Sequence, residues 1–124
     1  MTKKLHVERR RHKRFEVGED AFVILSPSDT GAGRLKNIGM GGLMFEYVAV
    51  KEPSLKVSEV EIFVTDSSFR LHGLPCKSVW DLPVYKVPSV SLHKRQCGVQ
   101  FGDLTPHQVS QLEYFIKNHT RGMI

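Results

Sequence analysis

The sequence has few of the features that mark membrane, secreted or disulfide-stapled proteins. No apolar run approaches the roughly 18 residues of a membrane span, and the basic N-terminus lacks the apolar stretch of a secretory signal. The 124 residues include two cysteines, Cys76 and Cys97, which suit a reducing compartment better than a disulfide framework. We therefore expect a cytoplasmic protein without a membrane span, in which both cysteines are free thiols.

Signatures of catalysis and of metal binding are missing as well. The six histidines do not have the spacing of metal ligands, and neither cysteine has a Cys-x-x-Cys partner. The sequence contains no recognisable acid–base pair and no nucleophile motif. We therefore expect no metal site, no cofactor and no enzymatic activity.

Acidic residues are almost missing from the first 14 positions. Seven basic residues there stand against one acidic residue, Glu8, so this segment carries +6 and the remaining residues carry −1 of the net charge of +5. The basic residues are Lys3, Lys4, Arg9, Arg10, Arg11, Lys13 and Arg14. Because burying unpaired cations is too costly, we expect residues 1–14 to form a flexible basic arm. Such an arm attracts phosphates, nucleic acid or an anionic membrane surface.

The rest of the chain has the pattern of a single β-rich domain. Short runs rich in aromatic and β-branched residues, separated by turn residues, predict strands over 21–26, 34–38, 43–47, 59–64, 69–80 and 97–101. Out-of-phase residues around Gly73 indicate a bulge in the fifth of these strands. The segment Asp81–Pro88 is expected to be irregular or an edge, and Lys94–Gln96 a turn.

One helix is predicted near the C-terminus, over residues 105–120. Thr105 has the character of an N-cap, Pro106 suits the first helical position, and Gln108 completes a capping box. Gly122 is expected to stop the helix. Residues 15–124 are therefore predicted to be mainly all-β: an antiparallel barrel of six or seven strands with one C-terminal α-helix.

Two motifs with a defined order connect the arm to the barrel. The first is the pair Arg10-x-x-x-Arg14 before the first long strand. The second is Asn37-Ile38-Gly39-Met40-Gly41-Gly42 between two strands. On this pattern the chain, from about Glu8 to Asn118, resembles the PilZ family, whose signature is Arg-x-x-x-Arg followed by Asp/Asn-x-Ser-x-x-Gly.

The resemblance implies a PilZ-type barrel that binds the bacterial second messenger cyclic di-GMP. Arg10, Arg14, Asn37 and Gly42 match the motif positions, and Gly39 stands where the motif has serine. Guanidinium groups suit this ligand because they bind phosphate and guanine edges through two parallel hydrogen bonds. Arg9 and Arg11 are secondary candidates for the same ligand. We predict that ligand closes the arm onto the barrel, and that a downstream protein partner reads the change.

Two other functions compete with this interpretation. Gly39 favours a PilZ-like module that has lost the ligand and works through protein contacts, for example in pilus or flagellar control. The basic arm alone would also suit a nucleic-acid binder, but the nearly neutral body makes nucleic acid an unlikely partner. Trp80 is expected in the core or at the barrel rim rather than as a stacking platform.

Overall fold

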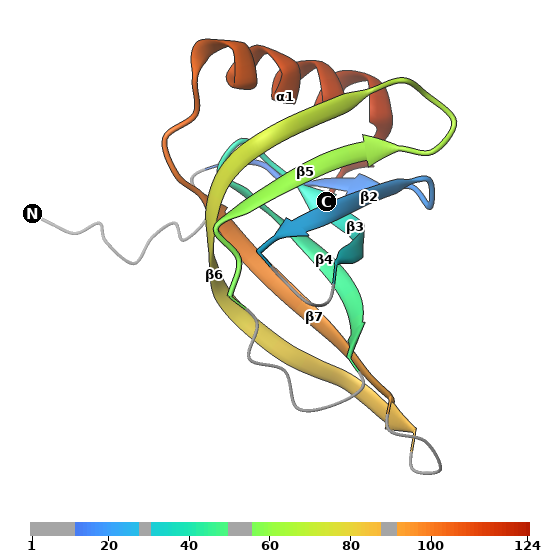
Figure 1. Ribbon diagram of the computed structural model, residues 1–124. Helices are drawn as coiled ribbons and strands as arrows, with labels where there is room; N and C mark the ends of the chain where they lie inside the picture. The colour runs from blue at the N-terminus through green and yellow to red at the C-terminus, as the bar shows by residue number, and fades with distance from the viewer. Residues whose placement is uncertain (1–11, 28–30, 50–55, 88–91) are drawn as a thin grey trace, which may run out of the picture.

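Six antiparallel strands close into a barrel in the computed structural model, which describes residues 12–27, 31–49, 56–87 and 92–124. The chain runs through eight strands and one helix in these parts (Figure 1). The elements are β1 (Phe15–Val17), β2 (Ala21–Ser26), β3 (Ala32–Ile38), β4 (Gly42–Ala49), β5 (Glu59–Val64), β6 (Arg70–Val87), β7 (Leu92–Phe101), α1 (Pro106–His119) and β8 (Thr120–Met123).

The strand order explains how the barrel closes and where its extra strands lie. Strands follow one another as β2-β5-β6-β7-β4-β3, and the pairing of β2 with β3 completes the ring. β2 pairs with the first half of β3, whereas β1 pairs with its end, through Phe15↔Ile38 and Glu16↔Asn37. β8 then pairs with β1. The predicted antiparallel barrel with a C-terminal helix is confirmed, with β1 and β8 added to it.

Alternating side chains form the core, as the sequence pattern predicts. In β2, Ala21, Val23 and Leu25 are buried while the residues between them point outward. β5 repeats the pattern, and its residues pair with those of β2 along the whole length of both strands. The predicted bounds of these two strands, 21–26 and 59–64, are confirmed.

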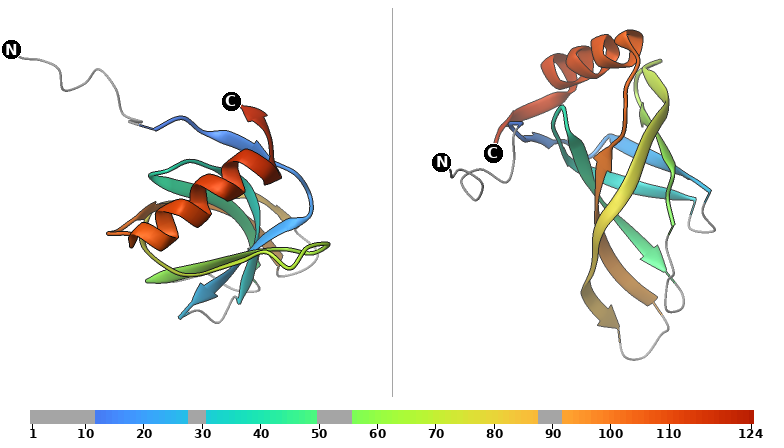
Figure 2. Two further views of the ribbon diagram at one scale, coloured as in Figure 1. Left: turned by 90° about the horizontal axis from the view of Figure 1, so that it is seen from above. Right: turned by 90° about the vertical axis from the view of Figure 1, so that its left-hand side faces the viewer.

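Helix α1 lies across one end of the barrel (Figures 1 and 2). Thr105 is its N-cap, and both bonds of the capping box to Gln108 are present, at 3.0 and 3.1 Å. Leu112 and Phe115 are fully buried and fill the barrel end. No helix in the described parts of the chain is long and apolar enough to cross a membrane.

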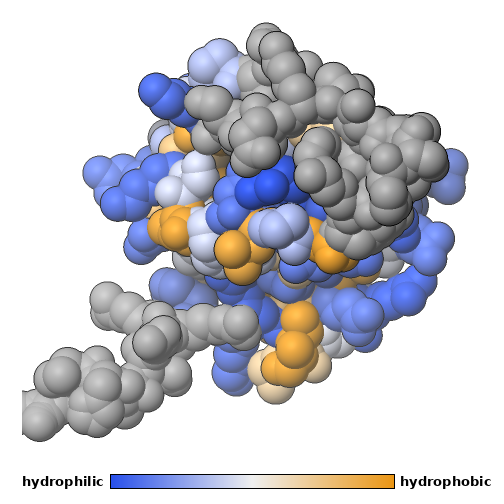
Figure 3. All heavy atoms as spheres, turned by 90° about the horizontal axis from the view of Figure 1, so that it is seen from below, coloured by the Kyte–Doolittle hydropathy of each residue, from blue (hydrophilic) through white to orange (hydrophobic). Residues whose placement is uncertain are grey.

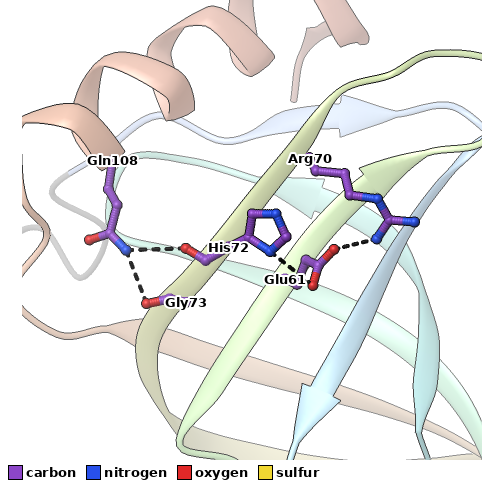
Figure 4. Close-up of polar contacts among 5 residues, drawn as sticks. All are labelled: Glu61, Arg70, His72, Gly73 and Gln108. Atoms are coloured by element: carbon purple, nitrogen blue, oxygen red, sulfur yellow. Dashed lines mark hydrogen bonds and ion pairs between the residues drawn. The ribbon is translucent and has the colours of Figure 1, made fainter.

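Gln108 also attaches the start of α1 to the barrel wall. Its amide Nε2 donates to the carbonyl oxygens of His72 and Gly73, at 3.2 and 3.0 Å (Figure 4). Gly73 has φ of +64°, a backbone conformation that other residues rarely adopt, and the register of β6 against β5 shifts here. The predicted bulge is thus confirmed, and its exposed carbonyls hold the helix.

The strands β6 and β7 are longer than the sequence indicates. Asp81–Pro88 was predicted to be irregular or an edge. It is not irregular up to Val87, where β6 ends, but it is an edge, because its strand partners in the described structure all lie on β7. The predicted turn Lys94–Gln96 is wrong, because these residues lie inside β7. Pro88 falls outside the described residues. The long β6–β7 hairpin therefore extends past the barrel on the side opposite α1 (Figure 2).

Cross-strand partners explain why these polar residues stay in strands. Arg95 Nε donates to Asp81 Oδ1 at 2.9 Å, and the buried Tyr47 hydroxyl donates to Asp81 Oδ2 at 2.6 Å. On the outer face, Gln96 donates to Glu46 at 3.0 Å and Lys94 forms an ion pair with it. Charged residues with partners on the neighbouring strand do not interrupt a sheet.

The strands β1 and β8 were not predicted, because they are three and four residues long. Gly122, expected to stop the helix, lies instead within β8. The helix ends three residues earlier, at His119, and Thr120 is both its C-cap and the first residue of the strand. The Thr120 hydroxyl donates to the Ile116 carbonyl at 2.7 Å, which bonds an otherwise unpaired carbonyl of the last turn.

Both cysteines are free thiols, as predicted. Burial raises the pKa of the Cys76 thiol to about 11, with a further contribution from the Glu59 carboxylate. Burial raises the pKa of Cys97 to about 12, and the Asp81 carboxylate adds to the effect. Both side chains are therefore protonated at neutral pH and pack as small apolar groups.

The barrel end opposite α1 is a mixed surface. In the view from below, hydrophobic side chains form separate spots among hydrophilic ones over the coloured residues (Figure 3). The exposed apolar residues of the long hairpin include Leu82 and Val84. Isolated apolar residues are normal on protein surfaces and do not by themselves indicate a binding site.

The capping box gives a test of how α1 is anchored. Thr105→Ala removes the hydroxyl that accepts a hydrogen bond from the backbone N–H of Gln108. We expect the free energy of unfolding to fall by about 1 kcal/mol. Urea denaturation followed by circular dichroism measures it. Thr105→Ser is the matched control, because it keeps the hydroxyl and should stay close to wild type. Equal loss in both variants would contradict the role of the cap.

Candidate functional site

Arg14 and Asn37, one residue from each motif, are joined by a hydrogen bond. Arg14 Nη1 donates to Asn37 Oδ1 at 2.9 Å, across 23 positions of sequence. The contact follows from the pairing of β1 with the end of β3, which sets Glu16 opposite Asn37 and so brings Arg14 beside the same strand. Both side chains are half-buried. The juxtaposition of the two motifs that the sequence predicts is therefore present for this pair.

The residues just before β1 lie directly on the glycine turn. A β-carbon at Gly39 would overlap the carbonyl oxygen of Lys13, and one at Gly41 would come within 2.7 Å of the His12 imidazole. Only residues without a side chain allow such close approach of another chain segment. We call His12, Lys13 and Arg14 the arm base. Within the arm base, His12 lies against Gly41, Lys13 lies against Gly39, and Arg14 bonds to Asn37.

The turn itself is closed by backbone hydrogen bonds. The Gly39 N–H donates to the Gly42 carbonyl at 2.9 Å, and the Phe101 N–H donates to the Gly41 carbonyl at 2.9 Å. The Gly39 N–H is therefore already used within the turn. The turn is a rigid support for the arm base.

The remaining predicted site residues divide into two groups. Gly42 is buried, and a β-carbon there would overlap the Val99 carbonyl, so this glycine lets β4 approach β7 closely. Arg9, Arg10 and Arg11 lie outside the described residues, as does most of the predicted arm 1–14. The structure thus describes Arg14, Asn37, Gly39 and Gly42 of the predicted set.

Strand register extends the site across the outer face of the barrel. Asn37 pairs with Met44 on β4, Met44 with Gly98 on β7, and Gly98 with Trp80 on β6. Their neighbours Ile38, Phe45 and Cys97 are buried in the core, so this row faces outward. Strands lie about 4.8 Å apart, so the row spans about 14 Å.

Trp80, which was predicted in the core or at the barrel rim, belongs to this row and does not lie in the core. Its indole ring lies on Gly98, where a β-carbon would overlap ring atoms, and the residue remains 40% exposed. The ring therefore covers the sheet and presents a surface to solvent. The signal in the sequence was Gly98 within a strand, which marks a close approach by another group.

Charges on this face are partly balanced by the protein itself. Burial alone would raise the pKa of Glu46, but the Gln96 hydrogen bond and the nearby Lys36 and Lys94 hold it below its usual value. Glu46 is therefore ionised and surrounded by basic groups. In the described parts of the chain, no group of three or more His, Cys, Asp and Glu side chains is placed to hold a metal ion.

A hollow of about 370 Å³ borders the arm base on the side of α1. Its walls are mostly apolar. His12, Lys13 and Phe15 line one side, Ile116 and Lys117 line the other, and Met40 lies at the tip of the turn. The arm base is therefore positioned between the glycine turn and the helix.

Comparisons with known proteins agree with this architecture. The model of the PilZ domain family matches residues 8–118. The search of the curated proteins found no significant match. The PilZ domain of YcgR from Escherichia coli, solved with c-di-GMP, is similar in structure. It has a TM-score of 0.66 and 15% identity, over 90% of this chain and 92% of that domain.

Two longer proteins contain a similar domain. YcgR from Escherichia coli in complex with c-di-GMP has a TM-score of 0.63 and 16% identity, over 90% of this chain and 46% of that one. MrkH, described as a c-di-GMP-dependent transcription regulatory factor, has a TM-score of 0.63 and 16% identity, over 89% of this chain and 50% of its own. The chain therefore spans about half the length of these two proteins, and at such low identity the likeness shows the fold alone. Because the family model covers most of the sequence, the protein belongs to the PilZ domain family.

Proposed function

We propose that this protein is a receptor for cyclic di-GMP, which it binds on the outer barrel face between the arm base and Trp80. The observation that carries the proposal is the hydrogen bond of 2.9 Å between Arg14 and Asn37, which sets the two family motifs side by side. The YcgR PilZ domain, of similar fold, was solved with this ligand. An oriented guanidinium suits a phosphate or a guanine edge.

In this proposal each part of the site recognises one part of the ligand. Arg14 and Arg10 bind the phosphates, with Arg9 and Arg11 adding attraction, and Asn37 meets a guanine edge. Trp80 offers an aromatic surface on which a purine can stack. The row from Asn37 to Trp80 spans about 14 Å, which supports contact with both ends of an elongated dinucleotide.

The proposed switch uses the arm in two parts. The arm base, His12 to Arg14, already lies on the glycine turn. The ligand then draws the preceding residues, including Arg10, onto the face, because its two negative charges neutralise the arginine cluster. A downstream protein partner reads the new surface. This narrows the predicted movement from the whole of 1–14 to the residues before His12.

A second function has a specific observation in its favour. The Lys13 carbonyl fills the space where the family motif has a serine side chain, and the Gly39 N–H is bonded within the turn. A ligand would therefore find one fewer side-chain donor than the motif provides. A PilZ-like interaction module that works without cyclic di-GMP, as in pilus or flagellar control, would tolerate this loss.

Titration calorimetry with cyclic di-GMP tests the proposal. We expect wild type to bind, and Arg14→Ala or Arg10→Ala to weaken binding roughly tenfold to 150-fold, because a charged hydrogen bond contributes about 1.5–3 kcal/mol. Arg70→Ala is the matched control. It removes the same charge from β6, where Arg70 pairs with Glu61, and should leave the affinity unchanged. Absence of heat from wild type at high micromolar ligand would favour the interaction module.

Restoring the family serine should weaken binding rather than strengthen it. In Gly39→Ser the new side chain must displace the Lys13 carbonyl, so the arm base and Arg14 move away from Asn37. We expect a loss of affinity of about tenfold, consistent with the usual 1–3 kcal/mol of overpacking. The same titration measures it.

Gly102→Ser provides the control for this substitution. A β-carbon at Gly102 would make an ordinary contact of 3.4 Å with Pro75, and the residue is exposed. The control should bind like wild type. Tighter binding by Gly39→Ser would mean that the hydroxyl reaches the ligand, as the motif implies. It would contradict the close contact between the Lys13 carbonyl and Gly39.

A further inference from the structure

Strand β1 is held on both of its edges. One edge pairs with the end of β3, and the other pairs with β8 through Phe15↔Met123, Glu16↔Gly122 and Val17↔Thr120. β8 comes from the C-terminal end of the chain and pairs in the described structure only with β1. The segment that follows the arm base is therefore enclosed between two strands that are far apart in sequence.

The same enclosure reaches Arg14 itself. The Ile124 N–H donates to the Arg14 carbonyl at 2.9 Å, while Arg14 Nη1 donates to Asn37 at the same distance. The backbone of the motif arginine is thus fixed by the C-terminal segment and its side chain by the glycine hairpin. The Ile124 side chain is 68% exposed, so its main interaction with the site is through its backbone.

β1 has too few residues to hold Arg14 alone. It is three residues long and has two paired positions with β3. Short edge strands with few partners open readily. Pairing with β8 supplies a second ladder. This pairing therefore fixes the backbone from which the Arg14 side chain projects. Binding an anion then costs less conformational entropy, because the arginine backbone is already ordered.

We infer that β8 and the Ile124 amide act as a positioning element that presents Arg14 to its ligand. The inference rests on the proposed function, because it concerns how the proposed receptor orients its binding arginine. It goes beyond the family motifs, which end before this strand. By linkage, a ligand bound to Arg14 stabilises the pairing of β1 with β8 in return.

The test uses a matched pair of variants at one position. Ile124→Pro removes the N–H that donates to Arg14, whereas Ile124→Ala keeps the N–H and shortens an exposed side chain. We expect Ile124→Pro to weaken cyclic di-GMP binding about three- to tenfold in calorimetry, as the loss of one hydrogen bond predicts, and Ile124→Ala to bind like wild type.

A double-mutant cycle separates positioning from general damage. If β8 acts through Arg14, Ile124→Pro should have no further effect on the residual affinity of Arg14→Ala. Equal losses in both backgrounds would overturn the inference and indicate a merely structural strand. Wild-type affinity in Ile124→Pro would overturn it too, while leaving the receptor function intact.

A second readout does not need the ligand. If wild type fails to bind, the proposed function fails, and amide hydrogen exchange then decides whether β8 holds the segment. Exchange at residues 15–17 should rise in Ile124→Pro and remain at the wild-type rate in Ile124→Ala. Unchanged exchange in both variants would show that β8 does not order this segment.

Discussion

The hydrogen bond between Arg14 and Asn37 is the contact on which the candidate site depends. It joins the end of a strongly basic segment to a hairpin 23 residues further on. An arginine side chain has several rotatable bonds and loses much rotamer freedom when it is held. The carbonyl oxygen of Asn37 orients it before any ligand is present. The site therefore starts from an ordered arginine on the barrel face.

Glycines around this contact determine how closely the segments approach. Gly39 and Gly41 admit the backbone and side chain of the arm base, and Gly98 admits the Trp80 indole. In each case another residue occupies the space that a side chain would fill. The departure of Gly39 from the family serine is thus a change in packing as well as the loss of a hydroxyl. At this turn the Lys13 carbonyl occupies the space that a serine side chain would need.

Local signals in the sequence predicted the parts of the fold that depend on local chemistry. The capping residues predicted the helix. The alternation of apolar and polar residues predicted β2 and β5 with their observed bounds. The errors arose where distant partners decide the structure. Lys94–Gln96 resembles a turn until Asp81 and Glu46 supply its partners. β1 and β8 are too short to produce a pattern, and β8 depends on β1, far away in the sequence, for its pairing.

In the candidate site, too, local sequence predicted some features, and others depend on residues far apart in the chain. The motif pair predicted that Arg14 and Asn37 would meet, because both lie in patterns that a single sequence can reveal. The core alternative for Trp80 was wrong, because its exposed position on Gly98 follows from strand register across the barrel, which local sequence does not reveal. The role inferred for Ile124 depends on a backbone amide, which has no signature in the sequence.

A titration of ¹⁵N-labelled protein with cyclic di-GMP tests the central claim most directly. It would be followed on the backbone amides of residues 12–14 and 37–42 and on the side-chain amide of Asn37. If the arm base and the glycine turn form one binding face, both groups should shift together and fit a single binding curve. Shifts confined to one group, or to neither at saturating ligand, would contradict the account.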